Sequence, residues 1–314
     1  MGIAFLFPGQ GSQHIGMGQG LHAQFDAARQ VYVEASDVLG WDVGKLCFEG
    51  PEAQLNQTAY TQPALLVTSI AAWRSLGAPI EAASVLAGHS LGEYTALVAA
   101  DALSFSDAVR IVHLRGRFMQ EAVQEGKGAM AAIIGLTREI IDRVCKDVTT
   151  SFGKVSSANY NAPGQVVISG EKESVLKAME QARNAGAKRT IQLAVSVPSH
   201  SPLMQPACLR LSDELDKIDG KNLQVPLINN LSAKEVYSWP DAKAGLVDQL
   251  SSPLLWEETI QEMQMKKVDL FVEVGPGRIL SGLMKRIDRR ANTMNVADPA
   301  GVEKVQTHLK PEHS

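Results

Sequence analysis

Residues 84–94 read SVLAGHSLGEY, and this stretch decides the predicted fold because it joins a strand to a helix through one tight turn. Its apolar start predicts a short buried strand at 84–87, and a helix is predicted at 93–100. Between them, Gly88-His89-Ser90-Leu91-Gly92 matches G-x-S-x-G, in which a serine nucleophile stands on a sharp strand-to-helix turn. The alternative interpretation is a plain tight turn whose serine caps the helix.

A second glycine-rich loop follows the first predicted strand. This loop, FPGQGSQ (7–13), can present backbone N–H groups to an anion. Beside Ser90 it would supply one donor of an oxyanion hole, and the N–H of Leu91 would supply the other. Dinucleotide binding is disfavoured, because the G-x-G-x-x-G pattern of this loop has His14 in place of its third glycine.

Predicted strands and helices alternate along the chain, which favours an α/β fold. Residues 126–198 have their own order of strand, helix, two strands, helix and strand, which is typical of a ferredoxin-like unit. Its six elements are expected at 129–134, 138–148, 155–160, 165–169, 171–185 and 188–197. We therefore expect an α/β core of residues 1–125 and 199–314 with an inserted subdomain at 126–198. The tail after Asn292 has only weak patterning.

A serine nucleophile needs a base, and His200 is the best candidate among seven histidines. It closes the stretch Val197-Pro198-Ser199-His200, just past a predicted strand, where the active-site residues of α/β sheets collect. The alternative is an exposed loop histidine. No acidic residue stands out as a third member, so a Ser–His dyad oriented by a carbonyl or an amide is as acceptable as a full triad.

An arginine falls on the apolar face of the helix predicted at 107–123, which Ser106 would cap. That face is marked at helical spacing by Ala108, Val112, Met119 and Ala122, and Arg115 lies on the same stripe. A buried guanidinium must meet an anion, because an unpaired buried charge is too costly. The anion is either an internal carboxylate or the carboxylate of a substrate, which arginine can bind through two hydrogen bonds.

Composition excludes several classes of protein. The chain has 314 residues, 45% of them hydrophobic, and a formal charge of −4, which argues against a general nucleic-acid binder. Three distant cysteines without a C-x-x-C pair argue against a disulfide framework or a zinc ribbon. The first residues lack the basic start of a signal peptide and reach Pro and Gly early, so we expect none, and no apolar run nears the length of about 18 residues that a membrane span needs. We expect a cytoplasmic protein without a membrane or nucleic-acid partner.

Eight motifs in order resemble the malonyl-CoA–acyl carrier protein transacylase family of bacterial fatty-acid synthesis, and the resemblance covers nearly the whole chain. They are FPGQGSQ (7–13), TQPAL (61–65), AGHSLGEY (87–94), RGRFMQ (115–120), GAMAAIIG (128–135), NAPGQVVISG (161–170), VSVPSH (195–200) and EVGPG (273–277). The resemblance implies an α/β-hydrolase-like core with an inserted ferredoxin-like subdomain. It also implies roles for single residues: Ser90 as the acyl-accepting nucleophile, His200 as its base, Gln10 and Leu91 as oxyanion-hole donors, Arg115 as the ligand of the malonyl carboxylate, and Gln249 as the residue whose carbonyl orients His200. Asn159 and Asn161 are further candidate substrate contacts.

The implied reaction is a ping-pong transfer of malonyl from CoA through Ser90 to the phosphopantetheine thiol of acyl carrier protein, with no metal or bound cofactor. Because carrier proteins of this pathway are acidic, we expect a basic docking patch drawn from Lys188, Arg189, Lys285, Arg286, Arg289 and Arg290. Three alternatives remain: a serine thioesterase or esterase that uses water, a polyketide-pathway acyltransferase with the same chemistry, and a non-catalytic carrier-protein binder.

Overall fold

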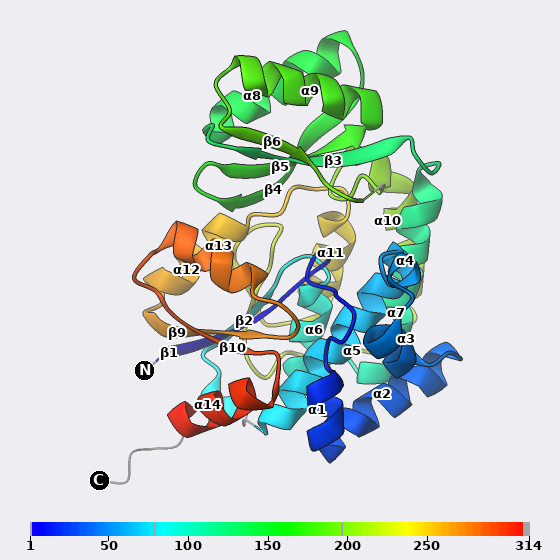
Figure 1. Cartoon of the computed structure of the whole chain (residues 1–314), viewed down its shortest axis with the longest axis vertical. Coiled ribbons are helices and arrows are strands. Elements are labelled where there is room, and N and C mark those ends of the chain that lie inside the picture. Colours follow the sequence, from blue (N-terminus) through cyan, green and yellow to red (C-terminus); the bar gives the residue numbers. More distant parts are fainter. Residues whose placement is uncertain (1, 78–79, 196, 310–314) are drawn as a thin grey trace.

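A computed structural model describes residues 2–77, 80–195 and 197–309, and these residues form two sheets with their helices. In Figure 1 the smaller sheet and its two helices, drawn in green, lie at one end of the molecule. The larger sheet and the remaining helices lie below them. The chain passes from the core into the smaller unit and back again, so the core is built from both ends of the sequence.

The larger sheet has six strands in the order β10-β9-β1-β2-β7-β8. Its strands pair in parallel, except that β8 runs antiparallel to β7. The strands are β1 (Gly2–Phe7), β2 (Val85–Gly88), β7 (Leu227–Ile228), β8 (Glu235–Val236), β9 (Val268–Val274) and β10 (Asn292–Val296). The middle strands are almost wholly apolar because helices cover both faces, as in other parallel sheets.

Helices pack on both faces of this sheet and bury its apolar side chains. One face is covered mainly by α2, α5, α6 and α7, and the other by α12 and α13. The helices of the core are α1 (Gln19–Gln24), α2 (Asp26–Leu39), α3 (Val43–Glu49), α4 (Glu52–Leu55), α5 (Thr58–Leu76), α6 (Gly92–Ala99), α7 (Phe105–Ala122), α10 (Gln205–Leu215), α11 (Trp239–Gln249), α12 (Trp256–Met265), α13 (Ile279–Ile287) and α14 (Pro299–Leu309), with 3-10 turns η1 (Ile80–Ala82) and η2 (Pro202–Met204). No helix among the described residues is both long enough and apolar enough to cross a membrane.

The smaller sheet is antiparallel, with the strand order β4-β5-β3-β6. Its elements are β3 (Gly128–Ile134), α8 (Arg138–Ser151), β4 (Val155–Ala162), β5 (Gln165–Glu171), α9 (Lys172–Asn184) and β6 (Arg189–Gln192). Both helices pack on one face and enclose a separate apolar cluster, which is the ferredoxin-like arrangement. The predicted fold class is therefore confirmed, while the division into 1–125 with 199–314 and 126–198 stays a prediction.

Several predicted elements have different bounds in the structure. The last strand of the small sheet ends at Gln192 instead of continuing to residue 197, although the Leu193 N–H still donates to the Met130 carbonyl oxygen, and Leu193 and Val195 line a cavity. Ser196, within that predicted strand, lies outside the described residues. The tail after Asn292 is not irregular, since it forms β10 and α14. β10 is an edge strand that is only partly buried, so its sequence has no clear apolar pattern.

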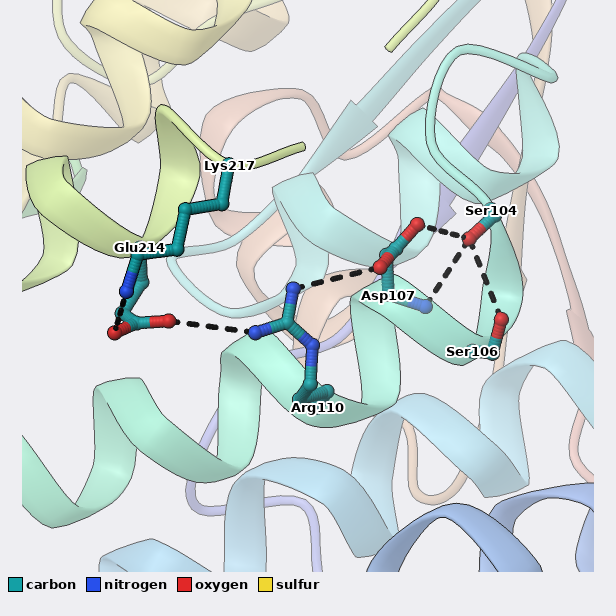
Figure 2. Close-up of polar contacts among 6 residues, drawn as sticks. All are labelled: Ser104, Ser106, Asp107, Arg110, Glu214 and Lys217. Carbon is teal, nitrogen blue, oxygen red and sulfur yellow. Dashed lines mark hydrogen bonds and ion pairs between the residues drawn. The ribbon is translucent and has the colours of Figure 1, made fainter. Parts of the chain in front are cut away.

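The predicted cap of α7 is also wrong by two residues. Figure 2 shows that Ser104, not Ser106, accepts the hydrogen bond from the backbone N–H of Asp107, at 3.1 Å. Ser104 has the extended backbone that an N-cap needs, whereas Ser106 already lies inside the helix. Arg110 then joins α7 to α10, because its guanidinium lies 3.3 Å from the Glu214 carboxylate.

Candidate active site

Ser90 stands on a strained turn between β2 and α6, with a positive φ of 54°. The two glycines around it allow this turn. A Cβ on Gly88 would lie 1.8 Å from the carbonyl carbon of Gly92, and a Cβ on Gly92 would lie 2.1 Å from the carbonyl oxygen of Phe7. Asn230, from the loop after β7, accepts the Ser90 backbone N–H at 2.7 Å. A strained turn that close contacts and a hydrogen bond hold in place is typical of a functional serine.

His200 lies within hydrogen-bond distance of this serine. Its Nε2 is 2.9 Å from the Ser90 Oγ, and its Nδ1 is 2.8 Å from the backbone carbonyl oxygen of Gln249. A carbonyl oxygen can only accept, so Nδ1 carries the hydrogen and Nε2 accepts the Ser90 hydroxyl. No carboxylate among the described residues bonds the ring, so the arrangement is a dyad oriented by a carbonyl.

Burial, together with the positive charge of Arg115, lowers the pKa of His200 to about 3. The imidazole is therefore neutral at physiological pH and has a lone pair available for a proton. His200 also has a positive φ of 58°, so the backbone on both sides of the dyad is strained.

Arg115 points from α7 to the same serine and is 1% exposed. Its Nη2 donates to the Ser90 Oγ and to the Gln249 Oε1, both at 3.1 Å, and its Nη1 donates to the Gln62 Oε1 at 2.9 Å. Within the described part of the chain no carboxylate lies within 4.0 Å of the guanidinium. Its direct partners are neutral, which argues against the internal ion pair and leaves its positive charge at the serine.

The backbone N–H groups of Gln10 and Leu91 lie beside the serine without acceptors. Among the described residues neither amide donates a hydrogen bond to another protein atom, and both residues line the cavity at Ser90. The loop that carries Gln10 is packed closely on the serine turn, because a Cβ on Gly9 would lie 2.3 Å from the His89 carbonyl oxygen. Two free N–H donors at one place are what an oxyanion requires.

These residues surround one cavity of about 180 Å³ between the core and the small sheet. Of the eight predicted site residues, seven line it: Gln10, Ser90, Leu91, Arg115, Asn159, Asn161 and His200. Gln249 stands behind it and reaches the serine, the histidine and the arginine. The Asn161 Oδ1 lies 2.9 Å from the His89 Nε2, which joins the two sides of the cavity.

The sequence patterns did not single out three residues that complete this arrangement. Gln62 accepts a hydrogen bond from the Arg115 guanidinium, and Asn230 accepts one from the Ser90 backbone N–H. Glu93 accepts a hydrogen bond from the side chain of Gln249, which contacts both Arg115 and Ser90. Gln62 and Glu93 fall inside motifs already quoted, and a signal was present for each, since both are polar residues within apolar helices. Asn230 gave no signal because it lies in a loop more than a hundred residues from Ser90.

Comparison with known proteins gives a consistent picture. The model of the acyl transferase domain family matches residues 4–313. The malonyl CoA-acyl carrier protein transacylase of Bacillus subtilis is 48% identical, covering 99% of this chain and 98% of the relative. That of Escherichia coli K12 is 47% identical, covering 91% and 92%.

Solved structures agree with these relatives. The transacylase of the same name from Coxiella burnetii superimposes with a TM-score of 0.95 at 41% identity, covering 99% of this chain and 98% of that one. A malonyl-transacylase solved in complex with its type II PKS acyl-carrier protein gives a TM-score of 0.95 at 47% identity, covering 98% and 100%. The chain therefore belongs to the malonyl CoA-acyl carrier protein transacylase family.

Proposed function

We propose that Ser90 carries the malonyl group as an ester while this protein transfers it from CoA to the thiol of an acyl carrier protein. One observation carries the assignment: the Ser90 Oγ lies 2.9 Å from a neutral imidazole nitrogen and 3.1 Å from a buried guanidinium. The first is a base for the hydroxyl, and the second is a ligand for an acyl group that has its own carboxylate.

In the first half-reaction, the His200 Nε2 takes the Ser90 proton as the Oγ attacks the thioester carbonyl. The negative oxygen of the tetrahedral intermediate would accept the free N–H groups of Gln10 and Leu91. The carbon–sulfur bond then breaks, and CoA leaves with the proton from His200. Ser90 is left as a malonyl ester.

In the second half-reaction the phosphopantetheine thiol gives its proton to His200, and its sulfur attacks the ester carbonyl. The ester bond breaks, Ser90 recovers its proton, and malonyl leaves as a thioester of the carrier protein. Each half begins with neutral His200, which its lowered pKa provides. The carbonyl of Gln249 keeps the Nδ1 proton in place throughout.

Arg115 favours malonyl over acetyl for two reasons. Its guanidinium can bind the malonyl carboxylate, and that negative charge in turn offsets the positive charge that depresses the pKa of His200. A malonyl thioester therefore makes His200 a stronger base, whereas an acetyl thioester leaves it unchanged. A plain thioesterase or esterase has no use for this buried charge.

The carrier protein would dock on the predicted basic patch. All six of its residues are exposed, and within the described residues none forms an ion pair. Lys188 of the small sheet unit and Arg286 of α13 line one groove, which Glu139, Glu257 and Glu258 also line. The patch therefore spans both parts of the chain beside the cavity. We also infer a cytoplasmic location, which suits three buried free thiols.

The test is intact-mass measurement after mixing the protein with malonyl-CoA, acetyl-CoA or methylmalonyl-CoA, followed by addition of holo-acyl carrier protein. We expect one malonyl group on the protein, located on the peptide that contains Ser90, and its loss to the carrier protein. Release of free malonate at the same rate without a carrier protein would instead indicate a thioesterase. Equal loading of methylmalonyl would favour the polyketide alternative.

A further inference from the structure

Glu93 is a buried carboxylate directly beneath the serine turn that the mechanism does not use. It lies in the first turn of α6, three residues after Ser90, and is 1% exposed. Its Oε1 accepts the backbone N–H of Asn230, and its Oε2 accepts the side-chain N–H of Gln249. Among the described residues no lysine, arginine or histidine pairs with it directly. Burial of an unpaired carboxylate is costly, so its retention here requires a reason.

The two hydrogen-bond partners of Glu93 contact the three residues of the proposed chemistry, namely Ser90, His200 and Arg115. Asn230 holds the Ser90 backbone N–H at 2.7 Å. Gln249 accepts a hydrogen bond from the Arg115 Nη2 at 3.1 Å, and its carbonyl holds the His200 Nδ1 at 2.8 Å. The Gln249 side chain also donates to the Ser90 carbonyl oxygen at 3.4 Å. Nucleophile, base and guanidinium are thus each one residue away from Glu93.

The orientation of the Gln249 amide matches a carboxylate on one side and a cation on the other. Its oxygen faces the donor of Arg115, so its nitrogen must face Glu93 as a donor. A protonated Glu93 would place an O–H donor against one of the two N–H groups whose hydrogen bonds it now accepts. A direct pair between Glu93 and Arg115 would occupy the guanidinium. Because the neutral Gln249 amide lies between the two charged groups, the guanidinium stays open to a substrate.

We propose that Glu93, as a carboxylate, is the positioning residue of this site, and that it sets the rate of acyl loading through Gln249 and Asn230 without touching the substrate. The proposal rests on the proposed function, because loading is defined by the ester on Ser90. It assigns to Glu93 an effect on both malonyl and acetyl loading, since Ser90 and His200, two of the groups that it positions, serve both thioesters. Arg115, in contrast, distinguishes between the two.

Several titratable groups face this network, and their pKa values separate Glu93 from the rest. Burial raises the pKa of Glu93 to about 8, against the lowering effect of its hydrogen bonds and of Arg115. Burial raises the pKa of Tyr94 on the same helix to about 12, and lowers that of His200 to about 3. Burial also lowers the pKa of His89 in the serine turn and raises that of Cys208 on α10. Arg115 on α7 keeps its charge, as guanidinium groups do.

The direction of the pH effect follows from these shifts. Below about pH 8 Glu93 takes up a proton, and its hydrogen bonds with Gln249 and Asn230 weaken, so the loading rate falls. As the pH rises through that value, the carboxylate forms and the rate rises. His200 is neutral on both sides of this range, so the change does not belong to the base.

The experiment measures the second-order rate of loading by malonyl-CoA and by acetyl-CoA between pH 6 and 9. Carrier protein is left out, so that no acceptor thiol titrates. For the unmodified protein we expect both rates to rise by at least about fivefold along one shared ionisation. Glu93→Gln should load more slowly, and its rates should not change with pH. The matched control is Glu273→Gln, a buried carboxylate that caps α13 through Leu280 and Ser281, and it should keep the pH slope.

A second variant keeps the test decisive if Glu93→Gln does not fold, as judged by its thermal melt. Gln249→Ala removes the link between Glu93 and Arg115 and keeps the link through Asn230, so it should reduce the pH slope. If both variants fold, their combined effect should be less than the product of the single effects. Flat rates in the unmodified protein, a slope retained in Glu93→Gln, or an undiminished slope in Gln249→Ala would overturn the proposal. A malonyl ester on Ser90 at any pH would leave the proposed function standing.

Discussion

The two walls of the cavity around Ser90 come from different parts of the chain and differ in chemistry. The wall formed by the core carries the serine, the histidine, the arginine and two free N–H groups. The wall formed by the small sheet carries Asn159 and Asn161 with apolar side chains, namely Met130, Val167, Leu193 and Val195. On the proposed mechanism, the core would perform the reaction and the small sheet would shape the space for the acyl group.

The largest expected effect comes from the nucleophile on the core wall. Ser90→Ala removes the one oxygen among the described residues that bonds both His200 and Arg115, so malonyl loading should fall by at least about 10⁴-fold. Quenched intact-mass measurement would follow the adduct. Ser201→Ala, at a neighbouring buried serine that bonds the Pro198 carbonyl, is the control and should still load. A full malonyl adduct on Ser90→Ala would move the chemistry to another residue.

The next effect separates malonyl from acetyl on the same wall. Arg115→Ala should lower malonyl loading by about 100-fold, because hydrogen bonds to a charged group are lost, while acetyl loading changes much less. Arg110→Ala, at an arginine on the same helix that pairs with Glu214, should leave the ratio of the two rates unchanged. Equal losses for both acyl groups in Arg115→Ala would contradict its role as the carboxylate ligand.

A smaller effect is expected from the wall of the small sheet. Met130→Ala widens the cavity, so the rate of methylmalonyl loading relative to malonyl should rise by about three- to tenfold, the effect of one methyl group in an apolar pocket. Met179→Ala removes a buried methionine from the far side of the same sheet and serves as the control. If both variants shift the ratio of methylmalonyl to malonyl loading equally, the cause is a loss of stability and not a change in cavity shape.

The smallest effect should come from outside the cavity, where the carrier protein would dock. Reversing Arg286 and Arg290 to glutamate should raise the KM for the carrier protein by a few fold at low salt, and less at high salt, because such attraction is screened. The same reversal at exposed Lys45 and Lys304 gives an identical net charge of −8, since each reversal subtracts two from −4. Equal KM values for the two double variants would locate docking elsewhere.

Much of the site could be predicted because its residues stand in local patterns. Ser90 was marked by the glycines of its turn, which the close contacts at Gly88 and Gly92 require. Arg115 was marked as a charge on an apolar helix face, and it is buried there. The role of Gln249 came only from the resemblance, because a backbone carbonyl that orients a histidine leaves no trace in side-chain type.

The bounds of elements were predicted less well than their existence. Local propensity did not separate Ser104 from Ser106 as the cap of α7, since both are good capping residues. The strand predicted up to residue 197 ends at Gln192, although the apolar pattern continues through Leu193 and Val195, which line the cavity. β10 was missed because an edge strand with half-buried side chains has little alternation to detect.

The α/β class, the serine turn and the choice of His200 and Arg115 could be predicted from sequence alone, because each depends on a local pattern. What those residues face depends on how distant segments pack together. The sequence left open whether Arg115 binds an internal carboxylate or the carboxylate of a substrate. In the fold, the neutral amides of Gln62 and Gln249 lie against it. Glu93 is separated from Asn230 and Gln249 by more than a hundred residues each. Contacts of that kind are fixed by packing in the interior, where a buried polar group must find its partner wherever the chain brings one.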